Sequence, residues 1–525
     1  MESKLNRGDE IVLGIDDAAF EGKSVGRIEG FVVFVEGAVP GDVVRVQILK
    51  KKKNFAEAKV VAIEKPSPFR VQPRCTHFGV CGGCRWQHVD YRKQLAFKAQ
   101  HVVDSFERIG GFSNLTILPL ISSDEIYFYR NKMEFSFSEQ QWLESPTHRE
   151  LRNSNFEIGN SQSLPAFGGQ AGAIFLGLHV PQRYDKVLEI EECHLQSEVS
   201  NQILNFVRSF ARRQKLPAYS SKSESGYLRF LVIRQSSALQ NPASGAESSV
   251  PNFVVRDENT RSATKAERHK GRDKRTNEIM VNLVTFDDRP EVMSQFAAEL
   301  CSAVPQITTI VNTINSRKAQ IAFGDIEKVY FGNGIIHERL GRHIFTISAS
   351  SFFQTNTAQA ERLYEVAKSF AELKPSDVVW DLYSGTGSIA LFVSDAAKEV
   401  VGIESVASAV SDAERNAKAN GVENCTFLLG DLKDRLTKDI GWMRSHAKPD
   451  VMIIDPPRSG MHPKVVEEIL EIAPPRIVYV SCNPATQARD VKALCSEKYR
   501  LVKLQPVDLF PHTYHIENVA QLTLR

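Results

Sequence analysis

The sequence lacks both features of a membrane-targeted chain. It contains no apolar run of about 18 residues, the length that a membrane-spanning helix needs, and no N-terminal segment in which charge precedes an apolar stretch. We therefore expect a cytoplasmic protein that is neither secreted nor inserted into a membrane.

A strong net charge is also missing, because 65 basic and 63 acidic side chains leave a formal charge of +2. Any binding to nucleic acid must then come from local basic patches.

Cysteine is scarce and unevenly spread, with eight residues in a chain of 525. In a reducing compartment this distribution disfavours a disulfide framework and favours metal binding or catalysis. Three cysteines lie on one glycine-rich, proline-flanked loop: Cys75, Cys81 and Cys84. Their C-x5-C-x2-C spacing lacks the paired C-x2-C units of most structural zinc sites, so with Cys193 as a distant fourth ligand it favours an iron–sulfur cube. Zinc ligation with His77 or His88, and buried free cysteines, remain alternatives.

The length of the chain excludes a single hydrophobic core and indicates about three domains. Residues 8–65 carry short alternating runs broken by glycines, a pattern typical of a small β-barrel. The run Lys50 to Lys53 lies between two of these strands, next to Phe55, and predicts a basic hairpin tip whose aromatic ring can stack on a base. A merely solvated tip is the alternative, because runs of like charge are usually solvated.

The middle of the chain alternates helices, strands and one long polar insertion. Apolar residues at helical spacing from Leu95 to Ile109 predict a packing helix that stops at the Gly110-Gly111 pair. The tetrapeptide Tyr129-Arg-Asn-Lys132 leads into an alternating strand and is either an RNA or cofactor contact or a simple turn. Residues 236–276 are polar and then basic, so we expect a disordered hairpin loop whose basic half either touches RNA weakly or is only solvated.

One stretch, Trp380 to Phe392, has the pattern of a buried strand, a tight glycine turn and a helix. Gly385 and Gly387 let the backbone turn sharply and approach a ligand, while the N–H groups of the following helix face it. The turn lacks the third glycine of the dinucleotide fingerprint and any phosphate-binding lysine. Alone it is a weak signal, and an ordinary strand–helix turn is the alternative.

Acidic residues strengthen this interpretation because they end successive apolar strands. Glu404 lies 23 positions after Asp381, where α/β nucleotide folds place a carboxylate for the ribose hydroxyls. Asp431 and Asp455 end two further apolar runs. Ligands bind outside the carboxyl ends of an open parallel sheet, so we expect these four acids to line one crevice for a nucleoside that tolerates positive charge. S-adenosylmethionine fits this description.

Two further chemical signals lie near the end of the chain. A strand from Val478 to Val480 ends in the polar turn Ser481-Cys482-Asn483-Pro484, which places a thiol at the same edge of the sheet, although a buried structural cysteine is the usual alternative. Glu517 lies next to that edge as well, just before the final strand. A nucleophile and a carboxylate base beside a methyl donor predict C5 methylation of a pyrimidine, in which the thiolate adds to C6 and the carboxylate removes the C5 proton before elimination.

Seven motifs, in this order, resemble the RNA (uracil-5-)-methyltransferase family: CGGCRWQH, YRNKMEF, FFQTN, DLYSGTG, DPPRSG, SCNPATQARD and FPHTYHIENV. The stretch GKSVGRIEGFVVFVEGAVPGDVVRVQI resembles the TRAM domain, an OB-like RNA-binding barrel, and this barrel with the cysteine cluster makes the chain most similar to the bacterial 23S rRNA branch. The resemblance implies a multi-domain fold with an OB-like β-barrel over 1–66, a central α+β iron–sulfur and RNA-binding domain over 67–345, and a Rossmann-like α/β methyltransferase domain over 346–525. The chain departs from the family in Tyr383, where phenylalanine is common, and in its long 236–276 insertion.

The resemblance also implies functional residues and partners. Contacts to S-adenosylmethionine are expected from Gln354, Tyr383, Ser388, Glu404, Asp431 and Asp455. A [4Fe–4S] cluster is expected on Cys75, Cys81, Cys84 and Cys193. Cys482 is the expected nucleophile and Glu517 the expected base. The expected substrate is a uridine of 23S rRNA, unpaired or flipped out of its helix, and the expected enzyme is a monomer.

Three competing functions share part of this pattern. A tRNA uracil-5-methyltransferase would use the same catalytic residues, so the sequence leaves rRNA and tRNA both open. An RNA cytosine-5-methyltransferase would need an acid to protonate cytosine N3 and a second cysteine motif that the sequence lacks. A non-catalytic RNA-binding iron–sulfur protein would not need Cys482 and Glu517 together with four cofactor acids.

Overall fold

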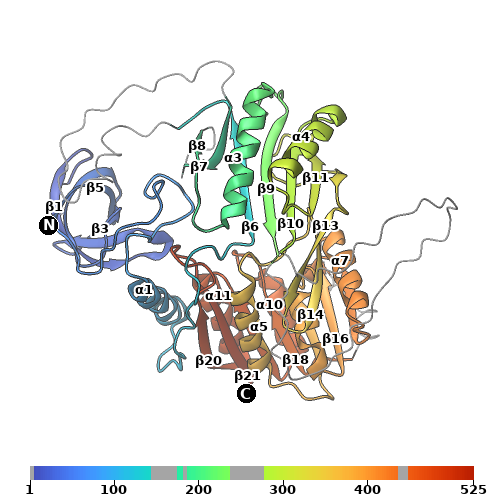
Figure 1. Ribbon diagram of the computed structural model, residues 1–525. Helices are drawn as coiled ribbons and strands as arrows, with labels where there is room; N and C mark the ends of the chain where they lie inside the picture. Colours follow the sequence, from blue (N-terminus) through green and yellow to red (C-terminus); the bar gives the residue numbers. More distant parts are fainter. Residues whose placement is uncertain (1–4, 143–173, 181–185, 237–276, 435–446) are drawn as a thin grey trace.

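The computed structural model describes residues 5–142, 174–180, 186–236, 277–434 and 447–525. The elements form an N-terminal barrel, a central seven-stranded sheet and a C-terminal seven-stranded sheet, which Figure 1 colours from blue through green and yellow to red. Helix α1 (Tyr91–Asp104) links the first and last of these, since His101 bonds to the Ala18 carbonyl of the barrel at 2.8 Å and Lys98 pairs with Asp508 at 2.6 Å. No helix in the described ranges is long and apolar enough to span a membrane.

The barrel is closed by five strands in the order β1-β2-β3-β5-β4. They are β1 (Glu10–Ala18), β2 (Ser24–Ile28), β3 (Phe31–Glu36), β4 (Val43–Lys51) and β5 (Phe55–Lys65). Alternate side chains of β4, at Val44, Val46 and Ile48, are buried, so the period-two pattern fills the interior. Gly26 permits the close crossing of β1 and β2, because a Cβ there would lie 2.5 Å from the Gly14 carbonyl oxygen. The predicted small barrel is confirmed.

The basic run forms the predicted hairpin tip between β4 and β5. The Lys52 N–H donates to the Phe55 carbonyl at 2.8 Å, and the side chains of Lys50 to Lys53 are exposed. Phe55 packs edge-on against Phe34, with ring centroids 5.5 Å apart. Part of this ring is therefore used inside the barrel, whereas the four cations face solvent.

The central sheet has the strand order β12-β11-β10-β9-β6-β7-β8. Its strands are β6 (Lys132–Ser138), β7 (Phe175–His179), β8 (Val187–Glu189), β9 (Leu228–Gln235), β10 (Ile279–Thr285), β11 (Thr309–Ile314) and β12 (Ile326–Phe331). Helices α3 (Glu198–Arg213) and α4 (Pro290–Ala303) meet over its core, where the ring centroids of Phe210 and Phe296 lie 5.2 Å apart. Because β9 and β10 pair antiparallel, with Gln235 opposite Ile279, the long insertion joins the two strands of a hairpin as predicted. Its predicted disorder concerns residues 237–276, which lie outside the described residues.

The C-terminal sheet has the order β17-β16-β15-β18-β19-β21-β20. Its strands are β15 (Val378–Leu382), β16 (Glu399–Glu404), β17 (Cys425–Leu429), β18 (Val451–Ile454), β19 (Arg476–Ser481), β20 (Tyr499–Val507) and β21 (Glu517–Leu524). The strands from β17 to β19 run parallel, and β21 lies antiparallel to both β19 and β20. From β15 the chain proceeds to one side through β16 and β17 and then to the other side through β18 and β19. In open α/β sheets, ligands bind in the crevice outside the carboxyl ends of the strands at such a reversal.

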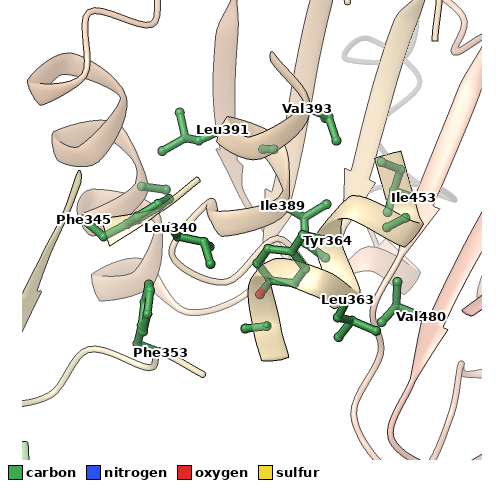
Figure 2. Close-up of a cluster of buried hydrophobic side chains, with 14 of the residues drawn as sticks. Leu340, Phe345, Phe353, Leu363, Tyr364, Ile389, Leu391, Val393, Ile453 and Val480 are labelled. Atoms are coloured by element: carbon green, nitrogen blue, oxygen red, sulfur yellow. The ribbon is translucent and has the colours of Figure 1, made fainter. Parts of the chain in front are cut away.

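Helices cover both faces of this sheet and bury it as its continuous apolar strands require. They are α5 (Thr357–Ala371), α6 (Ser388–Val393), α7 (Ala407–Ala419), α10 (Pro463–Ile472) and α11 (Pro484–Glu497). Figure 2 shows one of the two cores, in which Tyr364 of α5 packs near Ile389 of α6. The hairpin of β13 (Ile335–Leu340) and β14 (His343–Ser348) adds Leu340 and Phe345 to the same core.

Candidate active site and cysteine site

Two of the predicted cofactor acids lie at the reversal point of the C-terminal sheet. Glu404 ends β16, and its carboxylate accepts the Gly385 N–H at 3.0 Å and the Ser405 and Val406 N–H groups at 2.7 and 2.8 Å. Asp455 follows β18, and burial raises its pKa to about 7. The acids therefore flank the glycine turn that follows β15, as the strand ends predicted. Asp431 lies farther out and is exposed.

Asp381 does not line the crevice, contrary to the prediction that four acids face it. The residue is fully buried, and its Oδ2 accepts the Ala390 N–H of α6 at 3.0 Å. Burial raises its pKa well above the usual range, and the charges of Asp455 and Glu404 add to that effect. The physical reason is local: a helix that starts directly after a tight turn has unpaired N–H groups, and Asp381 satisfies one of them.

The glycine turn has three residues in the left-handed region within five positions. The φ angles of Tyr383, Gly385 and Gly387 are 65°, 54° and 76°. A Cβ on Gly387 would lie 2.7 Å from the Phe427 ring, whereas one on Gly385 would meet no atom within 4 Å. Gly387 is thus needed for packing, and Gly385 borders the open crevice. Tyr383 adopts a conformation that costs a non-glycine residue free energy, which is typical of ligand sites.

Ser388 and Gln354 meet at the hydroxyl of Tyr364. The Tyr364 hydroxyl lies 3.0 Å from Ser388 Oγ, and the Gln354 side chain also hydrogen-bonds to it. Burial raises the pKa of Tyr364, and the nearby Asp455 raises it further. The structure therefore brings two of the predicted cofactor residues together through a tyrosine that the sequence analysis did not identify.

The pairing of β19 with β21 brings the predicted nucleophile and base together. Ser481 lies opposite Asn518 in this antiparallel pair, so the next residues along the two strands, Cys482 and Glu517, are neighbours. Burial raises the pKa of Cys482 to about 11, and the charges of Glu517 and Asp455 oppose thiolate formation as well. Burial also raises the pKa of Glu517 well above its usual range, with a further contribution from Asp455.

Arg458 is the cation that opposes these shifts. Its charge and its hydrogen bond lower the pKa of Cys482, and its charge lowers that of Glu517. The backbone beside it is tied to the nucleophile's turn, because the Asn483 side-chain amide and the Thr486 hydroxyl donate to the Arg458 carbonyl at 3.0 and 3.2 Å. Arg458 belongs to the motif DPPRSG, but its role could not be predicted from the sequence, since only the fold places it beside Cys482.

The four cysteines of the predicted cluster line one cavity of about 580 Å³. Burial raises the pKa of Cys84 to about 12 and also raises the pKa values of Cys81 and Cys193. Backbone N–H groups donate to Cys75 Sγ and Cys81 Sγ at 3.4 Å each, and the Gln87 amide donates to Cys84 Sγ at 3.3 Å. Hydrogen bonds of this kind stabilise thiolate charge, and they surround iron–sulfur clusters.

Across the described ranges, no group of three or more His, Cys, Asp or Glu side chains is arranged to hold a metal ion. Of the two histidines considered as zinc ligands, His77 lines this cavity and His88 does not.

The tetrapeptide 129–132 hydrogen-bonds to loops that are distant in sequence. The Tyr129 hydroxyl donates to the Pro511 carbonyl at 3.1 Å, and the Asn131 side-chain amide donates to the Gln354 carbonyl at 2.9 Å and to the Thr357 hydroxyl at 2.8 Å. Arg130 and Lys132 line the cysteine cavity. The segment therefore holds the loops of both Gln354 and Glu517. Its predicted contact with RNA or cofactor stays a prediction.

Comparisons with known proteins agree with this arrangement. Residues 275–524 match the family model described as tRNA (uracil-5-)-methyltransferase, and residues 4–61 match the TRAM domain. An uncharacterized RNA methyltransferase of Porphyromonas gingivalis is 41% identical over 512 residues, covering 97% of this chain and 98% of that protein. Another, from Chlorobaculum tepidum, is 40% identical and covers 99% of this chain and 97% of its own.

A solved structure shows the same likeness across nearly the whole chain. The tRNA (uracil-54, C5)-methyltransferase of Pyrococcus abyssi in complex with S-adenosyl-L-homocysteine matches with a TM-score of 0.66 and 26% identity, covering 97% of this chain and 100% of that one. These matches confirm the predicted TRAM-like barrel and methyltransferase fold. The predicted iron–sulfur cluster stays a prediction.

Proposed function

Because the chain belongs to the RNA (uracil-5-)-methyltransferase family, we propose that it methylates C5 of a uridine through a covalent bond between Cys482 and C6. It is an S-adenosylmethionine-dependent RNA methyltransferase with a TRAM domain, as the motifs predicted. The observation that supports the covalent route is the placement of Cys482 beside Glu517, on adjacent strands at the same sheet edge as Glu404 and Asp455. We further propose the domain limits 1–66, 67–345 and 346–525.

The reaction needs a thiolate, and Arg458 favours it by its charge and its hydrogen bond to Cys482. The Cys482 thiolate adds to C6 of uracil, which turns C4, C5 and the C4 oxygen into an enolate. S-adenosylmethionine supplies the electrophilic methyl group when it is bound, and C5 takes it. Glu517 then accepts the C5 proton, after which the C6–sulfur bond breaks and the thiolate returns. The bond that breaks in the methyl transfer is the one between sulfur and methyl, so the products are methylated uridine, S-adenosylhomocysteine, a proton and the regenerated thiolate.

The raised pKa values of the carboxylates fit these roles. A base must accept a proton at neutral pH and release it afterwards, so a carboxyl with a pKa above its usual range is better suited than an ordinary one. Glu517 has this property because it is buried. A bound sulfonium group would add positive charge and lower the pKa values of Cys482 and Asp455 toward their ionised forms.

We assign the cofactor contacts to the residues around the crevice: Gln354, Tyr383, Ser388, Glu404, Asp431 and Asp455. The placement of Tyr383, Ser388 and Glu404 around the glycine turn supports this assignment, whereas Asp431 is exposed and lies farther out. Glu404 suits the ribose hydroxyls, since its carboxylate is held by three backbone N–H groups.

We propose that Cys75, Cys81, Cys84 and Cys193 hold a [4Fe–4S] cluster. The shared cavity and the hydrogen bonds to sulfur support this proposal. The cluster serves a structural purpose, because methyl transfer requires no redox step. It would join the loop of Cys84 to the central domain through Cys193.

As substrate we propose a uridine in 23S rRNA, on the combination of the TRAM domain with the cysteine motif. A tRNA substrate is the second candidate, and the likeness to the Pyrococcus abyssi enzyme over nearly the whole chain favours it. Mass mapping of 5-methyluridine in rRNA and tRNA from a deletion strain separates the two. Loss from 23S rRNA alone would support the first, and loss from tRNA alone would overturn it.

The catalytic assignment has its own test with purified enzyme and labelled RNA. Cys482→Ala should bind RNA and cofactor, form no covalent adduct and transfer no methyl group. Glu517→Gln should form the adduct and transfer the methyl group but release product slowly, since only elimination needs the base. Denaturing gels would show a retarded band for Glu517→Gln and none for Cys482→Ala. An adduct in Cys482→Ala would show that another residue is the nucleophile.

A further inference from the structure

The buried face of α1 is polar, although packing helices usually bury apolar side chains. Gln94 and Lys98 are both 0% exposed, and His101 is nearly as buried. Tyr91, Gln94 and Lys98 follow one another at helical spacing and so lie on one face. Burying a charge and an amide is costly unless their polar atoms are paired, so this face must have matched partners.

Five of those contacts reach the loop that precedes Glu517, residues 508–516, between β20 and β21. Others reach the Ala18, Trp86 and Val89 carbonyls and the Ser123 N–H. The Lys98 ammonium donates to Asp508 Oδ1 at 2.6 Å and to the Phe510 carbonyl at 3.0 Å. The Tyr91 hydroxyl donates to Asp508 Oδ2 at 2.8 Å. Gln94 Oε1 accepts the His512 N–H at 2.9 Å, and its amide lies 3.2 Å from His512 Nδ1. Three side chains of one helix thus hold three residues of the 508–516 loop.

The loop also carries backbone strain that these contacts retain. His512 has a φ of 65°, a left-handed conformation that is unfavourable for a histidine. Its carbonyl accepts the Arg85 and Trp86 N–H groups at 2.8 and 2.9 Å, directly after Cys84. The Gln94 amide donates to the Trp86 carbonyl at 2.9 Å, so one side chain connects the cysteine loop and the 508–516 loop. Strain of this kind persists only where the surroundings over-determine it.

We propose that Tyr91, Gln94 and Lys98 are positioning residues that hold the 508–516 loop so that Glu517 faces C5 of the target base. The proposal rests on the proposed role of Glu517 as base. The nucleophile is held separately, because the turn of Cys482 is bonded through Asn483 to Ser481 and Arg458. Loosening the 508–516 loop should therefore slow removal of the C5 proton more than it slows addition of the thiolate.

A merely structural role for α1 predicts a different outcome. Removing Lys98 alone leaves Asp508 charged and buried, which destabilises the fold whatever the function. Replacing both charges by apolar side chains, in Lys98→Met with Asp508→Leu, is often neutral for stability. This double variant still loses the bond from Lys98 to the Phe510 carbonyl and the bonds that the Phe510 N–H and the Tyr91 hydroxyl donate to Asp508. It therefore separates loss of positioning from loss of stability.

The test compares this double variant and Gln94→Leu with the parent and with Gln100→Leu, which makes the same change on the exposed side of α1. Two rates are measured on full-length protein: adduct formation on 5-fluorouridine RNA, which cannot proceed to elimination, and product release from natural RNA. Release should fall about ten- to a hundred-fold, with adduct accumulating, as for a misplaced catalytic group. Adduct formation should change less than about threefold, and Gln100→Leu should match the parent.

Thermal unfolding is recorded for each variant, and Glu517→Gln is run in parallel. If the double variant unfolds at the parent temperature and releases product at the parent rate, the positioning role is overturned. An equal fall in adduct formation and release would overturn it too. If Glu517→Gln accumulates no adduct, the proposed role of Glu517 as base is wrong. If Glu517→Gln accumulates adduct and the α1 variants do not, the base is correct and the positioning role is overturned.

Discussion

Arg458→Met tests whether the guanidinium makes Cys482 a nucleophile. The substitution keeps a long side chain but removes the charge and the hydrogen bond that favour the thiolate. Burial raises the pKa of Cys482 to about 11 even with Arg458 in place, so near neutral pH only a small fraction of the thiol is ionised in the free enzyme. Any further rise in the pKa lowers that fraction in direct proportion.

The magnitude follows from the interaction that is lost. A hydrogen bond to a charged group contributes about 1.5–3 kcal/mol, and one pKa unit corresponds to about 1.4 kcal/mol. The pKa of Cys482 should therefore rise by about one to two units. Below the pKa the thiolate fraction falls tenfold per unit, so adduct formation at neutral pH should slow by about ten- to a hundred-fold. The direction of the pH dependence follows from the raised pKa. The variant's rate of adduct formation should increase as pH rises, because its thiol ionises at higher pH than the parent's.

The assay measures adduct formation on 5-fluorouridine RNA from about pH 6.5 to about pH 9, since this substrate isolates the step before the base acts. The variant's profile should be displaced to higher pH by about one to two units relative to the parent. Arg458→Lys is the matched control, because it keeps the charge and should be displaced less. Both pKa values lie above this pH range, so the rates are measured at saturating RNA. A loss of rate that disappears when the RNA concentration is raised to saturation would refute the reasoning and would mean that Arg458 acts on RNA binding.

Three further outcomes are expected. Glu404→Ala should weaken S-adenosylmethionine binding by about 1.5–3 kcal/mol in calorimetry and leave RNA affinity nearly unchanged, and an equal loss of RNA binding would show that the crevice is misassigned. Anaerobically purified protein should be brown and should lose its iron and colour in Cys193→Ala, whereas colourless parent protein with stoichiometric zinc would contradict the cluster. Gly387→Ala should destabilise the fold by about 1–3 kcal/mol in urea unfolding, because its Cβ would lie 2.7 Å from the Phe427 ring, and Gly385→Ala should cost less; equal costs would contradict the steric argument.

The ends of the parallel strands were predictable from the sequence, because a strand that is buried on both faces is a continuous apolar run. Runs such as VVGIE and VMIID are apolar until they leave the sheet, and parallel strands end at one edge. That reasoning located Glu404 and Asp455 correctly. It failed for Asp381, whose run looks the same, because the direction of a side chain depends on the turn that follows it. The Asp381 carboxylate accepts the N–H of Ala390, and a strand pattern cannot predict that hydrogen bond.

The sequence placed the nucleophile and the base at the same sheet edge, but it did not predict that they lie on paired strands. Glu517 and Cys482 become neighbours because β21 inserts between β19 and β20, out of chain order. An antiparallel strand added at the end of a parallel sheet has no signature in its own residues. Arg458 and Tyr364 were missed for the same reason, since each acts on residues that are distant in sequence.

Helix α1 shows why apolar periodicity misleads near a functional site. The spacing from Leu95 to Ile109 predicted an apolar packing face, and the helix forms and ends beside Gly111 as expected. Val102 and Phe106 are fully buried as predicted, whereas Ile109 is 44% exposed. The stripe did not predict that Lys98 is fully buried against Asp508, 410 positions away. A pattern built on hydrophobicity cannot register a polar pair whose partner lies at the other end of the chain, because burial of that charge depends on the partner and not on the helix's own residues.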